Sequence, residues 1–120
     1  FVFASRYLPG SSSEDDTIVT WIGNKFFSFL GNALFSLNIS DILYTYVVGN
    51  TQKILNLNLK QKDFTLCVEL PIKAKKNGLR ISDAPANEKS RIGGTKKVNE
   101  LKDGFLILLH MIKLFFKNER

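Results

Sequence analysis

The chain has 120 residues, of which 44% are hydrophobic and 23% are charged, a composition that excludes a disordered segment and allows one small domain or part of a larger one. Its single cysteine excludes a disulfide framework, and its single histidine excludes a histidine-rich metal centre. The formal net charge is +6, and residues 73–102 carry this whole excess, with nine basic and three acidic side chains. This concentration favours an anionic partner, although a solvated basic loop has the same composition.

The first 36 residues predict a strand, a loop and a helix. Residues 1–4 are apolar and favour β structure, whereas residues 5–16 hold a Pro-Gly pair and three consecutive serines. In residues 17–36 apolar side chains recur every four positions, which predicts a helix with a wide apolar stripe facing the core, made by Ile18, Ile22, Phe26, Leu30 and Leu34. We assign Trp21, at the edge of this stripe, to the core as well.

The middle of the chain alternates between predicted strands and helices. Residues 42–48 are β-branched and aromatic and predict a strand, and residues 51–57 predict a short helix. A second helix is predicted over residues 64–76, where Pro71 indicates a kink or a boundary. Residues 79–85 predict a short strand. This alternation favours an α/β or α+β class, and such short strands fit part of a larger sheet.

The last predicted helix contains ten large apolar residues between positions 105 and 116, broken by His110 and Lys113. A membrane-spanning helix needs about 20 apolar residues, so this run is too short to span. It is apolar nearly all round, which leaves three alternatives open: burial against further parts of the protein, a place in the membrane interface, or an oligomer contact. We expect His110 to be a packed or interfacial residue rather than a catalytic base.

One loop carries the sharpest chemical signal. Residues 88–97, "EKSRIGGTKK", combine Arg91, two adjacent glycines and two lysines. Glycines allow close approach of the backbone to a ligand, and arginine binds phosphate in bidentate fashion. This combination suits a diphosphate leaving group, although a basic β-turn explains the same residues.

Two further side chains are candidates for a site. Arg6 follows the first predicted strand, and the carboxyl ends of strands are where α/β proteins bind ligands. Asp41 lies between a predicted helix and a predicted strand, where it could act as a general base. A surface arginine and a turn aspartate are the alternative interpretations.

Taken in order, these segments resemble the family 2 glycosyltransferases, in particular the branch of dolichyl-phosphate-mannose synthases and polyprenyl-phosphate glycosyltransferases. The resemblance covers residues 1–109 and rests on "FVFASRY", "SDILYTYVVGN", "DFTLCVELPIKAKKNGLRISDAP" and "EKSRIGGTKK". It corresponds to the C-terminal half of that family's catalytic domain. Ala4 stands where the family usually has glycine, and Tyr44 and Thr45 stand where many members have Ser-Gly.

The resemblance implies roles for five residues. It implies that Arg6 meets the phosphate of the acceptor and that Asp41 is a base or an acceptor-site group. It further implies that Arg91, Gly94 and Lys97 lie near the diphosphate of the donor.

The resemblance also implies a fold and an activity. The expected fold is α/β: a partial, Rossmann-like GT-A fold in which residues 1–104 form the acceptor-side part of the catalytic domain and residues 105–120 form a terminal amphipathic helix. The implied reaction moves a sugar from a nucleotide-sugar to a dolichyl or polyprenyl phosphate, with Mg²⁺ or Mn²⁺ held by an N-terminal half absent from this chain.

The implied partners are a nucleotide-sugar donor, a lipid-phosphate acceptor and a membrane surface. The apolar last helix also leaves open a homo-oligomer, with a second copy of the chain as partner. We expect a cytoplasmic protein at the membrane face, no nucleic-acid partner, and no activity from the 120-residue chain alone. Two other classes remain open. One is a non-catalytic basic module for nucleic acid or anionic membrane, which the lack of aromatic residues within the basic stretch disfavours for nucleic acid. The other is an interaction domain that pairs its apolar stripes with another chain.

Overall fold

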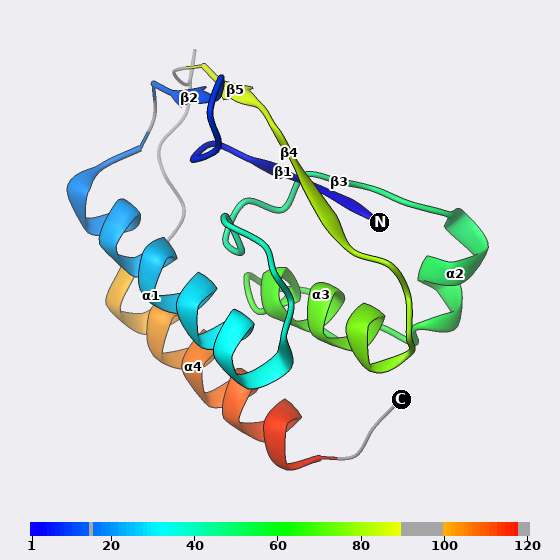
Figure 1. The fold of residues 1–120 in the computed structure, drawn as a ribbon. Helices are drawn as coiled ribbons and strands as arrows, with labels where there is room; N and C mark the ends of the chain where they lie inside the picture. Colours follow the sequence, from blue (N-terminus) through cyan, green and yellow to red (C-terminus); the bar gives the residue numbers. More distant parts are fainter. Residues whose placement is uncertain (15, 90–99, 118–120) are drawn as a thin grey trace.

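The computed structural model describes residues 1–14, 16–89 and 100–117 (Figure 1). Within these ranges the chain forms four helices and five short strands, which are β1 (Val2–Ser5), β2 (Ser12–Ser13), α1 (Ile18–Phe35), β3 (Val47–Val48), α2 (Thr51–Asn56), α3 (Leu66–Lys76), β4 (Ser82–Pro85), β5 (Asn87–Glu88) and α4 (Glu100–Phe116). The predicted α/β class is confirmed.

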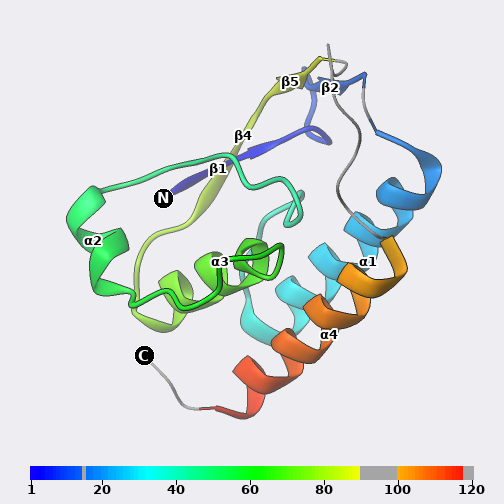
Figure 2. The ribbon, with the colours of Figure 1, turned by 180° about the vertical axis from the view of Figure 1, so that it is seen from behind.

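Strand β1 lies at the centre of a three-stranded mixed sheet with the order β3-β1-β4. It pairs in parallel with β4, with Phe3 opposite Asp83, and antiparallel with β3, with Phe3 opposite Val47. Strands β2 and β5 form a separate parallel pair. Figures 1 and 2 show α1, α3 and α4 together on one side of the three-stranded sheet. Because β1 and β4 are parallel, their carboxyl ends meet at one edge of the sheet, near the start of α1.

Helix α3 contacts both α1 and α4, and the core forms around it. Its apolar residues Val68, Ile72 and Ala74 are fully buried, as is Met111 of α4. Helices α1 and α4 run side by side in the same direction, and near their ends the rings of Phe35 and Phe115 meet edge to face at 6.0 Å between centroids. Residues 37–42, which follow α1, add further buried apolar side chains: Leu37, Ile39 and Ile42.

The predicted strand over residues 42–48 is wrong except at its end, where β3 forms. The N–H groups of Ile42 and Leu43 donate to side chains of α1 rather than to a neighbouring strand, at 3.0 Å each. The N–H of Tyr44 then donates to the carbonyl of Asp41 and closes a turn. Side-chain acceptors of α1 therefore replace the strand partners that the β-prone sequence would need.

The predicted direction of the apolar stripe on α1 is also wrong. Ile18, Ile22 and Phe26 are exposed, with relative accessibilities of 78%, 56% and 48%, and Trp21 is 47% exposed. The inward face is instead formed by Asn24, Phe27, Ser28, Gly31 and Phe35. Asn24 and Ser28 bind the backbone N–H groups of residues 42–43, and a Cβ at position 31 would lie 3.0 Å from the side chains of Leu37 and Ile42. Polar contacts and close packing therefore decide which face of α1 turns inward.

Pro71 does not end a helix, because α3 continues from Leu66 to Lys76. The proline is fully buried in the sixth position of this helix, where it removes one backbone donor. Packing against α1 and α4 offsets that loss. The end of the predicted range 64–76 is confirmed: Asn77 is the C-cap, and Gly78 has a φ of 73°.

Candidate functional site

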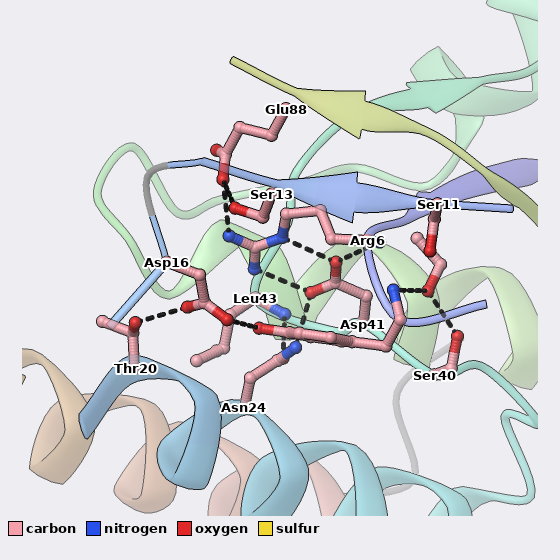
Figure 3. Close-up of polar contacts among 12 residues, drawn as sticks. Arg6, Ser11, Ser13, Asp16, Thr20, Asn24, Ser40, Asp41, Leu43 and Glu88 are labelled. Atoms are coloured by element: carbon pink, nitrogen blue, oxygen red, sulfur yellow. Dashed lines mark hydrogen bonds and ion pairs between the residues drawn. The ribbon is translucent and has the colours of Figure 1, made fainter. Parts of the chain in front are cut away.

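A network of polar side chains lies where the parallel strands β1 and β4 end (Figure 3). Ser5 is the last residue of β1, and Arg6 and Tyr7 follow it directly. This is the edge at which open α/β sheets bind ligands, because loops that leave the strands form a crevice there.

Arg6 and Asp41, which are 35 residues apart in the sequence, form a part-buried bidentate ion pair in the centre of this network, with side-chain exposures of 11% and 1%. Arg6 Nε donates to Asp41 Oδ2 at 2.8 Å, and Nη2 donates to Oδ1 at 2.9 Å. The backbone N–H of Arg6 adds a bond of 2.9 Å to Oδ2, and Asn24 Nδ2 adds one of 2.6 Å to Oδ1. Asp41 is only 2% exposed, and these four bonds use the acceptor positions of its carboxylate.

Glu88 of β5 contacts the other side of the guanidinium. Arg6 Nη1 donates to Glu88 Oε1 at 3.2 Å, and Ser13 Oγ of β2 donates to the same oxygen at 2.5 Å. Figure 3 shows the guanidinium held between the two carboxylates. The pairing of β2 with β5 therefore brings an acidic residue to Arg6 just before the basic segment of residues 89–97 begins.

Two tyrosines flank the same guanidinium. The Arg6 carbon Cζ lies 4.6 Å from the ring centroid of Tyr44 and 5.3 Å from that of Tyr7. Burial acts to lower the pKa of Arg6, but the hydrogen bonds and charge of Asp41 outweigh it and the pKa rises. Burial and the 2.7 Å bond from its hydroxyl to Asp16 raise the pKa of Tyr7. Arg6 is therefore a permanently charged group in a fixed position.

A second set of hydrogen bonds fixes the loop that carries Asp41. Ser40 donates from both its N–H and its hydroxyl to Asp83 Oδ2 of β4, at 3.0 and 2.8 Å. The hydroxyls of Ser5 and Ser40 lie 2.6 Å apart. On the other side, Asn24 Oδ1 of α1 accepts from the N–H of Leu43. Strand β4, strand β1 and helix α1 thus hold Asp41 in place from three directions.

The structure brings together two of the five residues singled out from the sequence, Arg6 and Asp41. Arg91, Gly94 and Lys97 lie outside the described residues. Sequence reasoning missed the partners Asn24, Tyr44 and Glu88. For Asn24 there is a signal in the sequence: Asn24 and Ser28 are polar residues four positions apart within one helix, which places both on one face.

Part of the hydrogen-bonding capacity of the Arg6 guanidinium is left unused by the described residues. Within the described part of the chain, hydrogen bonds use three of the five N–H donors of the guanidinium. Two donors therefore remain for an oxygen of a substrate or for a residue outside that part. A rigid guanidinium fork matches the geometry of a phosphate group.

The residues described here do not gather into a metal centre. No three of the histidine, cysteine, aspartate and glutamate side chains in these ranges lie close enough together to hold a metal ion. They therefore give no ligand set for the expected Mg²⁺ or Mn²⁺, and we derive no step through a metal. None of the helices in the same ranges is long and apolar enough to cross a membrane.

Comparison of the chain with protein-family models, with curated proteins and with solved structures finds no match in any of the three. The resemblance to glycosyltransferases therefore stays a prediction from the sequence, and the geometry at Arg6 is the structural observation from which a function can be argued.

Proposed function

We propose that the chain is the acceptor-side part of a family 2 glycosyltransferase, a partial GT-A fold that transfers a sugar from a nucleotide-sugar to a lipid phosphate. The observation that carries this proposal is the part-buried pair of Arg6 and Asp41 at the carboxyl end of β1. It places a fixed cation, flanked by two aromatic rings, at the edge of the sheet where a phosphate would enter.

In this proposal Arg6 binds the phosphate of the acceptor with the donors that Asp41 and Glu88 do not use. Asp41 orients the guanidinium, because its four hydrogen bonds leave no acceptor position for a substrate proton. The second pKa of a phosphate monoester is about 6, so the acceptor is mostly deprotonated at neutral pH and attacks without a general base. The base role that the sequence suggests for Asp41 stays a prediction, and it would require Arg6 to release the carboxylate.

The donor diphosphate would meet the basic segment that follows. Arg91 comes three residues after Glu88 in the sequence, and Gly94 and Lys97 follow. In the proposal these residues neutralise the charge that develops on the departing diphosphate. A bound Mg²⁺ or Mn²⁺ would supply further positive charge there, with ligands from a donor-side part of the protein.

The lipid acceptor is supported by an exposed apolar surface on α1 and α4. Seven large apolar residues of α1 and seven of α4 are at least 38% exposed, and the two helices lie side by side. Isolated exposed apolar residues are ordinary, but an extended patch marks an interaction surface. We propose that this face rests on the cytoplasmic surface of a membrane, with a second copy of the chain as the other candidate to cover it.

Binding of farnesyl phosphate, a short acceptor analogue, tests the role of Arg6. We expect calorimetric titration to show saturable binding, and farnesol, which lacks the phosphate, to bind at least about tenfold more weakly because it leaves the guanidinium unpaired. Arg6→Lys should weaken the binding of farnesyl phosphate by about tenfold or more, since an ammonium cannot reproduce the planar fork.

The matched control is Arg80→Lys, an exposed arginine that precedes β4 at the opposite end of the sheet. It should leave the affinity unchanged, and circular dichroism should show the same fold for both variants. Equal affinity of the wild type and Arg6→Lys for farnesyl phosphate would contradict the proposed role.

A further inference from the structure

A cavity separate from the Arg6 network lies between α3, α4 and the residues that precede α3. Its volume is about 160 Å³. The charged and imidazole side chains that line it are Lys60, Glu69, Lys73, His110, Lys113 and Lys117. None of them belongs to the network around Arg6, so the cavity requires an explanation of its own.

The acidic residue that lines the cavity, Glu69, is hydrogen-bonded to other residues of the same wall. Glu69 is 1% exposed, and its carboxylate accepts from the N–H groups of Lys60 and Gln61 at 2.6 and 2.8 Å and from Lys73 Nζ at 2.9 Å. Lys73 Nζ also donates to the carbonyl of Asn58 at 3.0 Å. Among the described residues of the wall Glu69 is the one acid, against four lysines, so the side chains that line the cavity have a net positive charge.

His110 adds an unsatisfied polar atom to this wall. Its Nε2 is buried and has no hydrogen-bond partner within the described part of the chain. Burial is the main cause that lowers the pKa of His110; Lys113 and Lys73 lower it further, and Glu69 and Asp63 oppose them. A buried ring nitrogen without a partner is costly, and an acceptor placed in the cavity would remove that cost.

Lys76, which does not line the cavity, attaches the end of α4 to α3. Lys76 Nζ of α3 donates to the carbonyl oxygens of Leu114 and Lys117, the latter at 2.7 Å. Lys113 and Lys117, which line the cavity from α4 and the residue after it, are therefore close to α3.

We propose that this cavity binds a phosphate-class oxyanion, which accepts a hydrogen bond from His110 Nε2 and lies against the ammonium groups of Lys113 and Lys117. Its volume holds one such anion with a few waters, since a water occupies about 30 Å³ in the liquid. Ammonium groups are effective partners of phosphate oxygens, and bonds between charged groups are the strongest of their kind. The anion is either free phosphate or the headgroup of an anionic lipid, whose chains could meet the exposed apolar residues of α4.

The single histidine makes proton NMR a specific test, because the imidazole resonance can come only from His110. At constant ionic strength, inorganic phosphate should shift this resonance saturably and raise the pKa of His110, since the bound anion favours the protonated ring. Lys113→Ala, a change at an exposed residue, should weaken the effect by about tenfold, whereas Lys53→Ala on α2 should not.

A parallel titration with vesicles identifies the source of the anion. Saturable perturbation of His110 by phosphatidylserine vesicles, absent with phosphatidylcholine vesicles and with inorganic phosphate, would assign the site to a lipid headgroup. Perturbation by inorganic phosphate that Lys113→Ala removes would assign it to the free anion. If neither probe perturbs His110 saturably, or if Lys113→Ala and Lys53→Ala respond alike, the proposed site is overturned. None of these results bears on farnesyl phosphate binding at Arg6, so the two proposals fail separately.

Discussion

Replacing Asp41 by alanine is expected to lower the free energy of unfolding by about 3–5 kcal/mol, because it removes the buried carboxylate that pairs with Arg6 in bidentate fashion and leaves the guanidinium, among the described acids, only its 3.2 Å contact with Glu88. The substitution removes four hydrogen bonds at once, three from Arg6 and one from Asn24. A domain of this size has a total stability of about 5–15 kcal/mol, so the loss should be plain in urea unfolding followed by circular dichroism.

The double variant Arg6→Met with Asp41→Leu is the informative companion to this experiment. Because it removes both charges, it should be less destabilised than Asp41→Ala alone, and the double-mutant cycle should give a favourable coupling between the two positions. As a comparison, Asp63→Ala removes an exposed aspartate and should cost less. A loss below about 1 kcal/mol for Asp41→Ala would contradict the part-buried ion pair.

Glu69→Ala should produce a loss of similar size, about 3–5 kcal/mol, at a buried ion pair. The change leaves Lys73, which is 5% exposed, without the carboxylate 2.9 Å from its Nζ. It also removes the acceptor for the backbone N–H groups of Lys60 and Gln61. These bonds join the segment before α3 to the first turn of that helix, so urea unfolding should report their loss directly.

Glu69 also makes the stability of the fold depend on pH. Burial acts to raise the pKa of Glu69, but hydrogen bonds from Lys60, Lys73 and Gln61 and the charge of Lys73 outweigh it and the pKa is lowered. The unfolded chain has the ordinary glutamate pKa of about 4.3. Its contribution is therefore fully present above that pH and is lost as the pH falls through the lower pKa of the folded state.

Glu69→Gln tests this linkage, because glutamine does not titrate. The variant should be less stable than the wild type at neutral pH, and the difference between them should shrink below about pH 4.5. Equal acid dependence of the two proteins, measured by urea unfolding at a series of pH values, would show that Glu69 does not carry this charge-dependent stability.

The apolar pattern of the sequence predicts the structure correctly where apolar packing alone decides it. The helix predicted over residues 64–76 forms as α3, and its apolar residues Cys67, Leu70 and Ile72 are buried. The apolar pattern on α1 predicts the wrong inward face, because Asn24 and Ser28 turn inward to bind the backbone just after Asp41. The spacing of apolar residues does not register long-range polar contacts of this kind, so it indicates the wrong face when these contacts outweigh apolar burial.

The candidate site shows the same limit. Arg6 and Asp41 each had a chemical reason to be noticed, but their direct contact depends on how the segment after α1 returns to the end of β1. Glu88 reaches Arg6 only because β5 pairs with β2. By contrast, Glu69 and Lys73 are four residues apart on one helix, a spacing at which an ion pair could have been predicted from the sequence.

Sugar transfer is the most direct measurement of the proposed function. A protein that contains this chain together with a donor-binding part should transfer labelled sugar from a nucleotide-sugar to polyprenyl phosphate. The 120-residue chain alone should not transfer sugar.

Arg91→Ala should abolish transfer without altering the circular dichroism spectrum, because one positioned donor to a developing charge is worth about a 100-fold to 1,000-fold change in rate. Arg80→Ala should remain active. Transfer that Arg91→Ala leaves unchanged would contradict the diphosphate role. Absence of transfer, together with RNA binding that weakens steeply with salt, would favour the basic binding module instead.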